Sequence, residues 1–83
     1  MKYLLLRTRD EIIHPIIFDP TIQHESMRAR FPNWELVSAG KINLNTLKCS
    51  AKSVSLNIEY SNTQSMNDTT TVAAMINLAE QMA

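Results

Sequence analysis

The sequence of 83 residues has only one glycine and one cysteine, and each shortage excludes a class of structure or site. One glycine, Gly40, is too few for the glycine-rich loops that cradle phosphate groups in nucleotide-binding proteins. One cysteine, Cys49, forms no internal disulfide and provides no Cys-x-x-Cys metal clip. The core must therefore hold by packing alone, and a reducing cytoplasm is the expected location.

Net charge and long apolar runs are also missing. Eight basic residues balance eight acidic ones, although residues 1–52 carry all eight basic residues and only five of the acids. Nucleic-acid-binding proteins normally have a clear basic excess, so this balance makes nucleic acid an unlikely main partner. The apolar run from Tyr3 to Leu6 is too short for a signal peptide or a membrane span. We expect a protein that keeps its N-terminus and stays out of the membrane.

The composition that remains is that of a small globular protein. Apolar residues make up 45% of the chain and charged residues 19%, which predicts one folded domain over residues 1–83. A chain of this length buries a modest core, so its stability is marginal without help from a partner copy. A domain this small is also expected to have difficulty enclosing a pocket of several hundred cubic ångströms.

The N-terminal third predicts two strands. Lys2–Arg7 is short, apolar and closed by charge, which is typical of a strand that is buried on both faces. Residues 8–11 form a polar turn, and residues 12–18 predict a second strand, antiparallel to the first. Pro15 lacks an N–H group, so this strand is expected to lie at an edge of the sheet or to break there.

A short helix is predicted next. Asp19 is a favourable helix cap, and Pro20 fits the first helical position, where no N–H donor is needed. The helix is expected to continue over residues 21–30 and to end before Pro32, because the residue preceding proline avoids the helical region.

The middle of the chain alternates between apolar and polar residues, which predicts strands over residues 35–45 and 53–60. Gly40 inside the first of these indicates a bulge with positive φ, a bend or a close backbone approach. A register change is expected near Lys52. The second strand is predicted to direct four residues into the core: Val54, Leu56, Ile58 and Tyr60.

The chain is predicted to close with a helix. Ser61 and Gln64 have the spacing of a capping box, although the weak helix formers that follow allow a start nearer Asp68. Apolar residues then recur at helical intervals: Val72, Met75, Ile76, Ala79 and Met82. The predicted order is β-β-α-β-β-α, an α+β two-layer fold with an antiparallel sheet of about four strands and two helices on one face.

Three segments of this pattern resemble small uncharacterised proteins encoded by phages and prophages: Ile16–Phe18 with His24, Val37–Gly40, and Ser53–Leu56. The chain departs from that pattern at Lys41, where an aromatic residue is usual, and at Ala51, where a second glycine is usual. The resemblance implies a phage or mobile-element setting and no known activity.

Candidate catalytic and metal-binding residues are few, and they are badly spaced. Five residues have ligand chemistry, but no two of them have the spacing that aligns ligands on one helix face or one strand: His14, His24, Asp19, Glu25 and Cys49. Cys49 in a strand is most often a small buried apolar residue, and no serine lies in a Gly-x-Ser-x-Gly turn. We therefore expect no metal site, no cofactor and no enzymatic activity.

Two non-enzymatic interpretations remain. The preferred one is a protein-interaction module that forms a homodimer. Its expected contact residues are Phe31, Trp34, Lys41, Met75 and Met82. The unshielded edge of the predicted strand over residues 35–45 motivates it, because Lys41 is the only strong deterrent to edge pairing there. The alternative is weak nucleic-acid binding, with base stacking on Tyr3, Phe31 or Trp34 and phosphate contacts from Arg7, Arg9, Arg28, Arg30, Lys41, Lys48 and Lys52.

Overall fold

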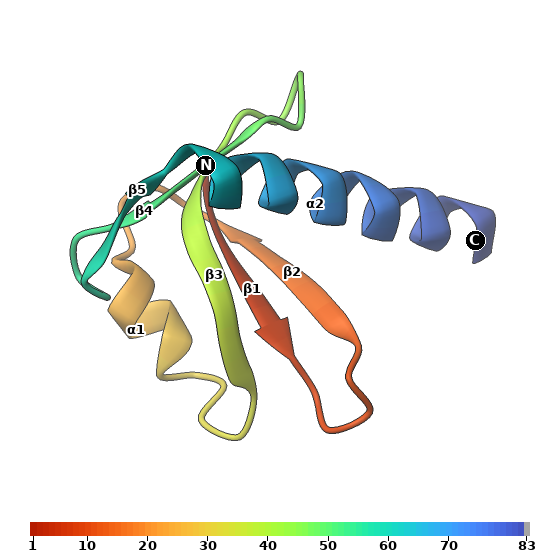
Figure 1. Ribbon diagram of the computed structural model, residues 1–83. Helices are drawn as coiled ribbons and strands as arrows, with labels where there is room; N and C mark the ends of the chain where they lie inside the picture. Colours follow the sequence, from red (N-terminus) through yellow and green to blue (C-terminus); the bar gives the residue numbers. More distant parts are fainter. Residues whose placement is uncertain (83) are drawn as a thin grey trace.

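The computed structural model describes residues 1–82 and shows an antiparallel sheet that lies between two helices (Figure 1). The strands are β1 (Lys2–Arg7), β2 (Ile13–Phe18), β3 (Glu35–Ile42), β4 (Cys49–Ser53) and β5 (Ile58–Ser61), and the helices are α1 (His24–Arg28) and α2 (Asn62–Met82). The strand order is β2-β1-β3-β4-β5. The predicted α+β class with an antiparallel sheet is confirmed, but the sheet has five strands and not four.

Strand β1 is buried on both faces, as its sequence predicts. Tyr3 and Leu5 belong to one core cluster, and Leu4 and Leu6 belong to another, because successive side chains of a strand point to opposite faces. None of the four is more than 1% exposed. The sheet therefore needs an apolar cover on each side.

The two helices supply these covers from opposite faces, so the prediction of a two-layer fold with both helices on one face is wrong. Val72 of α2 is fully buried in the cluster that contains Tyr3 and Leu5. Met27 of α1 packs in the cluster on the other face, with Leu4. A strand that is apolar on both sides cannot be satisfied by helices gathered on one side.

The edges of the sheet differ from the prediction in one respect. Pro15 lies on the edge strand β2, opposite Leu5 of β1, so its missing donor costs no hydrogen bond inside the sheet, as predicted. Strand β3, however, is not an edge, because it pairs with β1 on one side and with β4 on the other. The edge that was expected to pair with a second copy is therefore occupied within the chain.

The predicted strand over residues 53–60 is wrong, because a turn over residues 54–57 divides it into the end of β4 and the start of β5. Asn57 takes the left-handed conformation, with φ of 59°, and its N–H bonds to the carbonyl of Val54. Val54 is 84% exposed and Tyr60 57% exposed, whereas Leu56 and Ile58 pack half-buried against the core. The expected register change is present, between Ala51 and Ser53.

The first helix is shorter than predicted. Asp19 accepts hydrogen bonds from the N–H and hydroxyl groups of Thr21, so it closes a turn before the helix, and α1 begins only at His24. An aspartate that bonds two residues ahead stabilises a turn as readily as a helix start. Arg28 donates to the carbonyl of Phe31 just after the helix end.

The second helix begins where its capping residue predicts. Ser61 accepts a hydrogen bond from the N–H of Gln64 at 3.1 Å, which fixes the start at Asn62 and not near Asp68. Between residues 1 and 82, neither helix combines the length and the apolar character needed to cross a bilayer.

The single glycine serves packing and not a turn. The left-handed turn positions fall on Glu11, Leu47 and Asn57, and Gly40 does not have a positive φ. Gly40 lies in β3 opposite Ala51, and a Cβ atom there would lie 2.0 Å from the carbonyl oxygen of Ser50. The predicted close backbone approach is confirmed, whereas the bulge with positive φ is wrong. The irregularity of β3 lies earlier in the strand, between Leu36 and Ser38, where they pair with Leu6 and Leu5.

We expect Gly40→Ala to lower the free energy of unfolding by about 1–3 kcal/mol, because the added methyl group forces β3 and β4 apart. Urea denaturation followed by circular dichroism measures the free energy of unfolding. Ser50→Ala, on the facing strand, keeps the backbone carbonyl and should change it by less than about 0.5 kcal/mol. Equal stability of the two variants would show that β3 and β4 are not this close.

Candidate functional site

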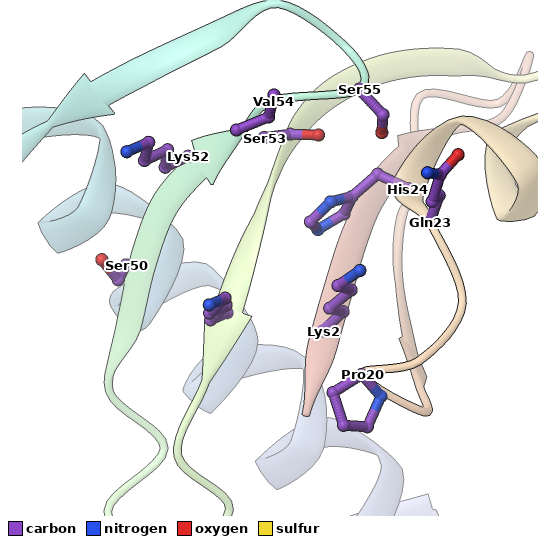
Figure 2. Close-up of a pocket in the computed structure, with 10 residues that line it drawn as sticks. Lys2, Pro20, Gln23, His24, Ser50, Lys52, Ser53, Val54 and Ser55 are labelled. Carbon is purple, nitrogen blue, oxygen red and sulfur yellow. The ribbon is translucent and has the colours of Figure 1, made fainter.

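A recess of about 650 Å³ opens on the face of the sheet that α1 covers only in part (Figure 2). Its floor comes from β1, β3 and β4, and its walls from the segment that leads into α1 and from the turn after β4. The expected difficulty in forming a pocket of this size does not arise, because the recess is a hollow open to solvent. It is lined by Lys2, Pro20, Gln23, His24, Lys41, Ser50, Lys52, Ser53, Val54 and Ser55.

The charged side chains that line the recess are all basic. Within the part of the chain that the structure describes, the lining contains three lysines and neither aspartate nor glutamate. Lys2 pairs directly with Lys41 across β1 and β3, and Lys41 pairs with Ser50 across β3 and β4. Lys52 follows two residues after Ser50, so all four side chains point to the same face.

Two lysines directly opposite each other destabilise a sheet, because their charges repel. Lys2 is held in place by a hydrogen bond of 2.8 Å from its ammonium group to the carbonyl of Ile22. An anion bound between the ammonium groups would replace this repulsion with attraction, and lysine is a common partner of phosphate. The charges of the recess would therefore be balanced by a bound anion.

His24 forms part of the wall at the start of α1 (Figure 2). Its Nε2 atom donates to the carbonyl oxygen of Gly40 at 2.8 Å, since a carbonyl only accepts, and this bond ties α1 to β3. Burial lowers the pKa of His24, and the charges of Lys2 and Lys41 lower it further against the opposing effect of the Gly40 bond. The imidazole is thus a positioned neutral group whose Nδ1 atom accepts hydrogen bonds.

The wall on the other side is made by serines. The Ser55 hydroxyl accepts from the N–H of Glu25 at 3.1 Å, which joins the turn after β4 to α1. Ser53 is buried and accepts from the N–H of Leu56 at 3.3 Å. These bonds hold both walls, so the recess has a defined shape without a ligand.

The structure brings together only part of the predicted basic set. Lys41 and Lys52 line the recess, and Lys48 lines a shallower hollow beside it. Arg7, at the far end of β1, forms an exposed ion pair with Glu35 at 3.3 Å. The remaining predicted arginines lie outside both hollows: Arg9, Arg28 and Arg30.

The predicted contact residues are scattered. Phe31 and Trp34 are half-buried, stack on each other with ring centroids 5.2 Å apart, and pack against the α1-side core. Met75 is half-buried on α2, and Met82, near its end, is 79% exposed. Tyr3, predicted as a base-stacking residue, is fully buried.

The groups with catalytic chemistry lie apart. Cys49 belongs to the core cluster under α2, and burial raises the pKa of its thiol, whereas His24 lies on the opposite face of the sheet. His14 stacks on Trp34, with ring centroids 5.1 Å apart. Among residues 1–82, no three histidine, cysteine or acidic side chains gather closely enough to hold a metal ion.

A buried polar cluster lies on the α2 side of the sheet. Asp68 is 1% exposed, and its carboxylate accepts hydrogen bonds from the side chains of Tyr3 and Ser38, each at 2.5 Å, and Gln64, at 2.7 Å. Burial raises the pKa of the Tyr3 hydroxyl, and the Asp68 carboxylate raises it further, so the phenol stays a donor. These bonds fasten α2 to β1 and β3, which is a structural task.

The sequence did not identify Lys2 and His24 as residues of one recess. Lys2 belongs to a strand whose apolar residues predict burial in the core. His24 belongs to a segment that predicts a longer helix, with His24 on its exposed surface. The recess could be recognised from lysines that lie on one face of neighbouring strands, but this pattern becomes visible only once the pairing register of the strands is known.

Comparisons of the chain with protein-family models, with curated proteins and with solved structures found no match. The resemblance to phage-encoded proteins stays a prediction.

We expect Tyr3→Phe to lower the free energy of unfolding by about 1.5–3 kcal/mol, because it removes one hydrogen bond to a buried carboxylate. Tyr60→Phe is the matched control: it deletes the same hydroxyl from an exposed ring and should change the value by less than about 0.5 kcal/mol. Urea denaturation at neutral pH compares the two. Similar, small losses would mean that Asp68 does not depend on Tyr3.

Proposed function

We propose that the protein is a non-enzymatic binding module that holds a phosphate-bearing ligand in the recess. The observation that carries this proposal is the row of Lys2, Lys41 and Lys52, which lines one hollow with no acid among its lining residues within residues 1–82. The lysine ammonium groups offer charge, and they and the serine hydroxyls offer the hydrogen bonds that phosphate oxygens accept. A cytoplasmic location and a phage or mobile-element setting remain parts of the proposal.

The absence of catalysis is proposed on the positions of the reactive groups. His24 is committed to the Gly40 carbonyl, and Cys49 lies on the opposite face of the sheet, so the two do not form a nucleophile–base pair. The recess serines Ser53 and Ser55 accept hydrogen bonds from backbone N–H groups, and within residues 1–82 neither is hydrogen-bonded to a side chain that could act as a base.

Binding of inorganic pyrophosphate at low salt tests the proposal. Titration followed by amide chemical shifts should move signals of Lys2, Lys41 and Ser50, and Lys41→Ser should weaken the affinity about three- to tenfold through the loss of one charged contact. Arg30→Ser removes the same charge from an exposed position outside both hollows and should leave the affinity within about twofold.

Two results would contradict the proposal. Equal weakening by both variants would show that only net charge matters. No shifts at about 10 mM pyrophosphate would show that the recess does not bind phosphate at all.

Self-association is a second candidate, supported by the end of α2. The helix covers the sheet with Val72 and Ile76, but from Asn77 onward its described residues are exposed and it extends past β2 (Figure 1). Leu78 is 48% exposed and Met82 79% exposed. Leu78 and Met82, the latter from the predicted apolar stripe, thus lie on the part of α2 that the sheet does not cover, and the same part of a second copy could cover them across a two-fold axis.

Sedimentation equilibrium at micromolar concentration is expected to give about twice the mass of 9.4 kDa. Leu78→Glu should return the protein to monomer, because it places a charge in the apolar contact. Met66→Glu, at an exposed methionine near the other end of α2, is the control and should leave the dimer intact. A monomer at about 100 µM wild-type protein would refute self-association.

A further inference from the structure

The recess continues into a second, shallower hollow, and the two share Lys41 and Ser50. The second hollow has a volume of about 590 Å³ and adds Lys48, from the connection between β3 and β4. Four lysines therefore line one continuous surface: Lys2, Lys41, Lys48 and Lys52. A single phosphate group contacts only part of such a surface, whereas a chain of phosphates can follow it.

An exposed aromatic ring lies next to this surface. Ser61 pairs with Ala51, whose side chain points to the α2 side because it alternates with Lys52. Tyr60 directly precedes Ser61 in β5, so its side chain points to the opposite face, the α1 side, which is also the face of Lys52. Ile58, two residues before Tyr60, packs in the α1-side core, as this alternation requires. Tyr60 is 57% exposed on the strand next to β4.

The net charge of zero does not prevent a polyanion from binding at the surface that the four lysines line. Of the acids that balance the lysines, Asp68 is buried among its hydrogen-bond donors and Glu35 is paired with Arg7. No acid is among the residues that line either hollow, as far as residues 1–82 are concerned. The residues that line the two hollows are thus basic although the total charge of the chain is zero.

We propose, on the basis of the function proposed above, that the ligand is single-stranded nucleic acid. Its phosphates lie along the four lysines, and one unpaired base stacks on Tyr60. Flexible polyanions follow a basic surface without sequence preference, and a stacked aromatic ring adds affinity that is tolerant of sequence. A paired base inside a duplex does not present its face to Tyr60, so single strands bind more tightly than duplexes.

Fluorescence anisotropy with a labelled oligothymidylate of about 10 nucleotides tests this ligand. The logarithm of the affinity should fall with the logarithm of salt with a slope of about −3, from four phosphate contacts. Tyr60→Ala should weaken binding at least about fivefold, through the loss of one stacked base, while inorganic polyphosphate, which has no bases, should bind the variant and the wild type equally. Lys41→Ser and Lys52→Ser together should lower the slope to about −1.5.

The double variant Arg9→Ser and Arg30→Ser is the matched control, because it removes the same two charges from exposed residues outside both hollows. It should leave the affinity within about threefold. Circular dichroism checks that every variant is folded.

The outcomes separate this inference from the proposed function. If pyrophosphate binds but the oligonucleotide does not, or if Tyr60→Ala binds the oligonucleotide as wild type does, single-stranded nucleic acid is wrong and the phosphate site stands. If a duplex of the same length binds as tightly as the single strand, the stacking model is also overturned. If neither probe binds, the proposed function fails together with the inference.

Discussion

The burial of β1 on both faces is the constraint on which the rest of the structure depends. Tyr3 and Leu5 need an apolar cover on one side, and Leu4 and Leu6 need one on the other. A strand of this kind has to lie inside the sheet, and β2 and β3 flank it there. Each face must then receive its own helix, which is why α1 and α2 lie on opposite sides.

The two helices differ greatly in length, and this difference leaves the recess open. Helix α2 has 21 residues and covers its face across several strands, with Asp68 fastened to Tyr3 and Ser38 beneath it. Helix α1 has only five residues, because Asp19 bonds to Thr21 in a turn and delays the helix start to His24. The part of the sheet that α1 does not reach carries polar side chains, since apolar ones would remain exposed there.

Stability and binding make opposite demands on this uncovered face. A sheet is most stable when unlike charges or apolar groups face each other across strands, yet Lys2 and Lys41 are directly opposed. Gly40 is next to Lys41 and allows β3 and β4 to approach closely, so the lysines and Ser50 are brought to neighbouring positions. The small fold thus tolerates repulsion at one place, and that place is the site proposed for the ligand.

Local features of the fold were predictable because their causes are local. Pro15 lacks a donor wherever it stands, and it lies at an edge. Ser61 caps α2 through an atom three residues away, and Gly40 marks a close approach. The prediction failed over residues 53–60, where apolar alternation continues through a turn that is made by the left-handed Asn57 and by the hydrogen bond from Leu56 to Ser53.

The sequence by itself determined the α+β class, the central apolar strand, the long C-terminal helix and the absence of glycine-rich and cysteine-based sites. Only the tertiary structure decided which faces the helices cover, that β3 is central, and that Lys2, Lys41, Lys48 and Lys52 line one surface beside Tyr60. The reason is physical. Periodicity along the chain records which side chains share a face of one strand, but strand order and register are set by packing between segments that are distant in sequence, and they decide which charges become neighbours.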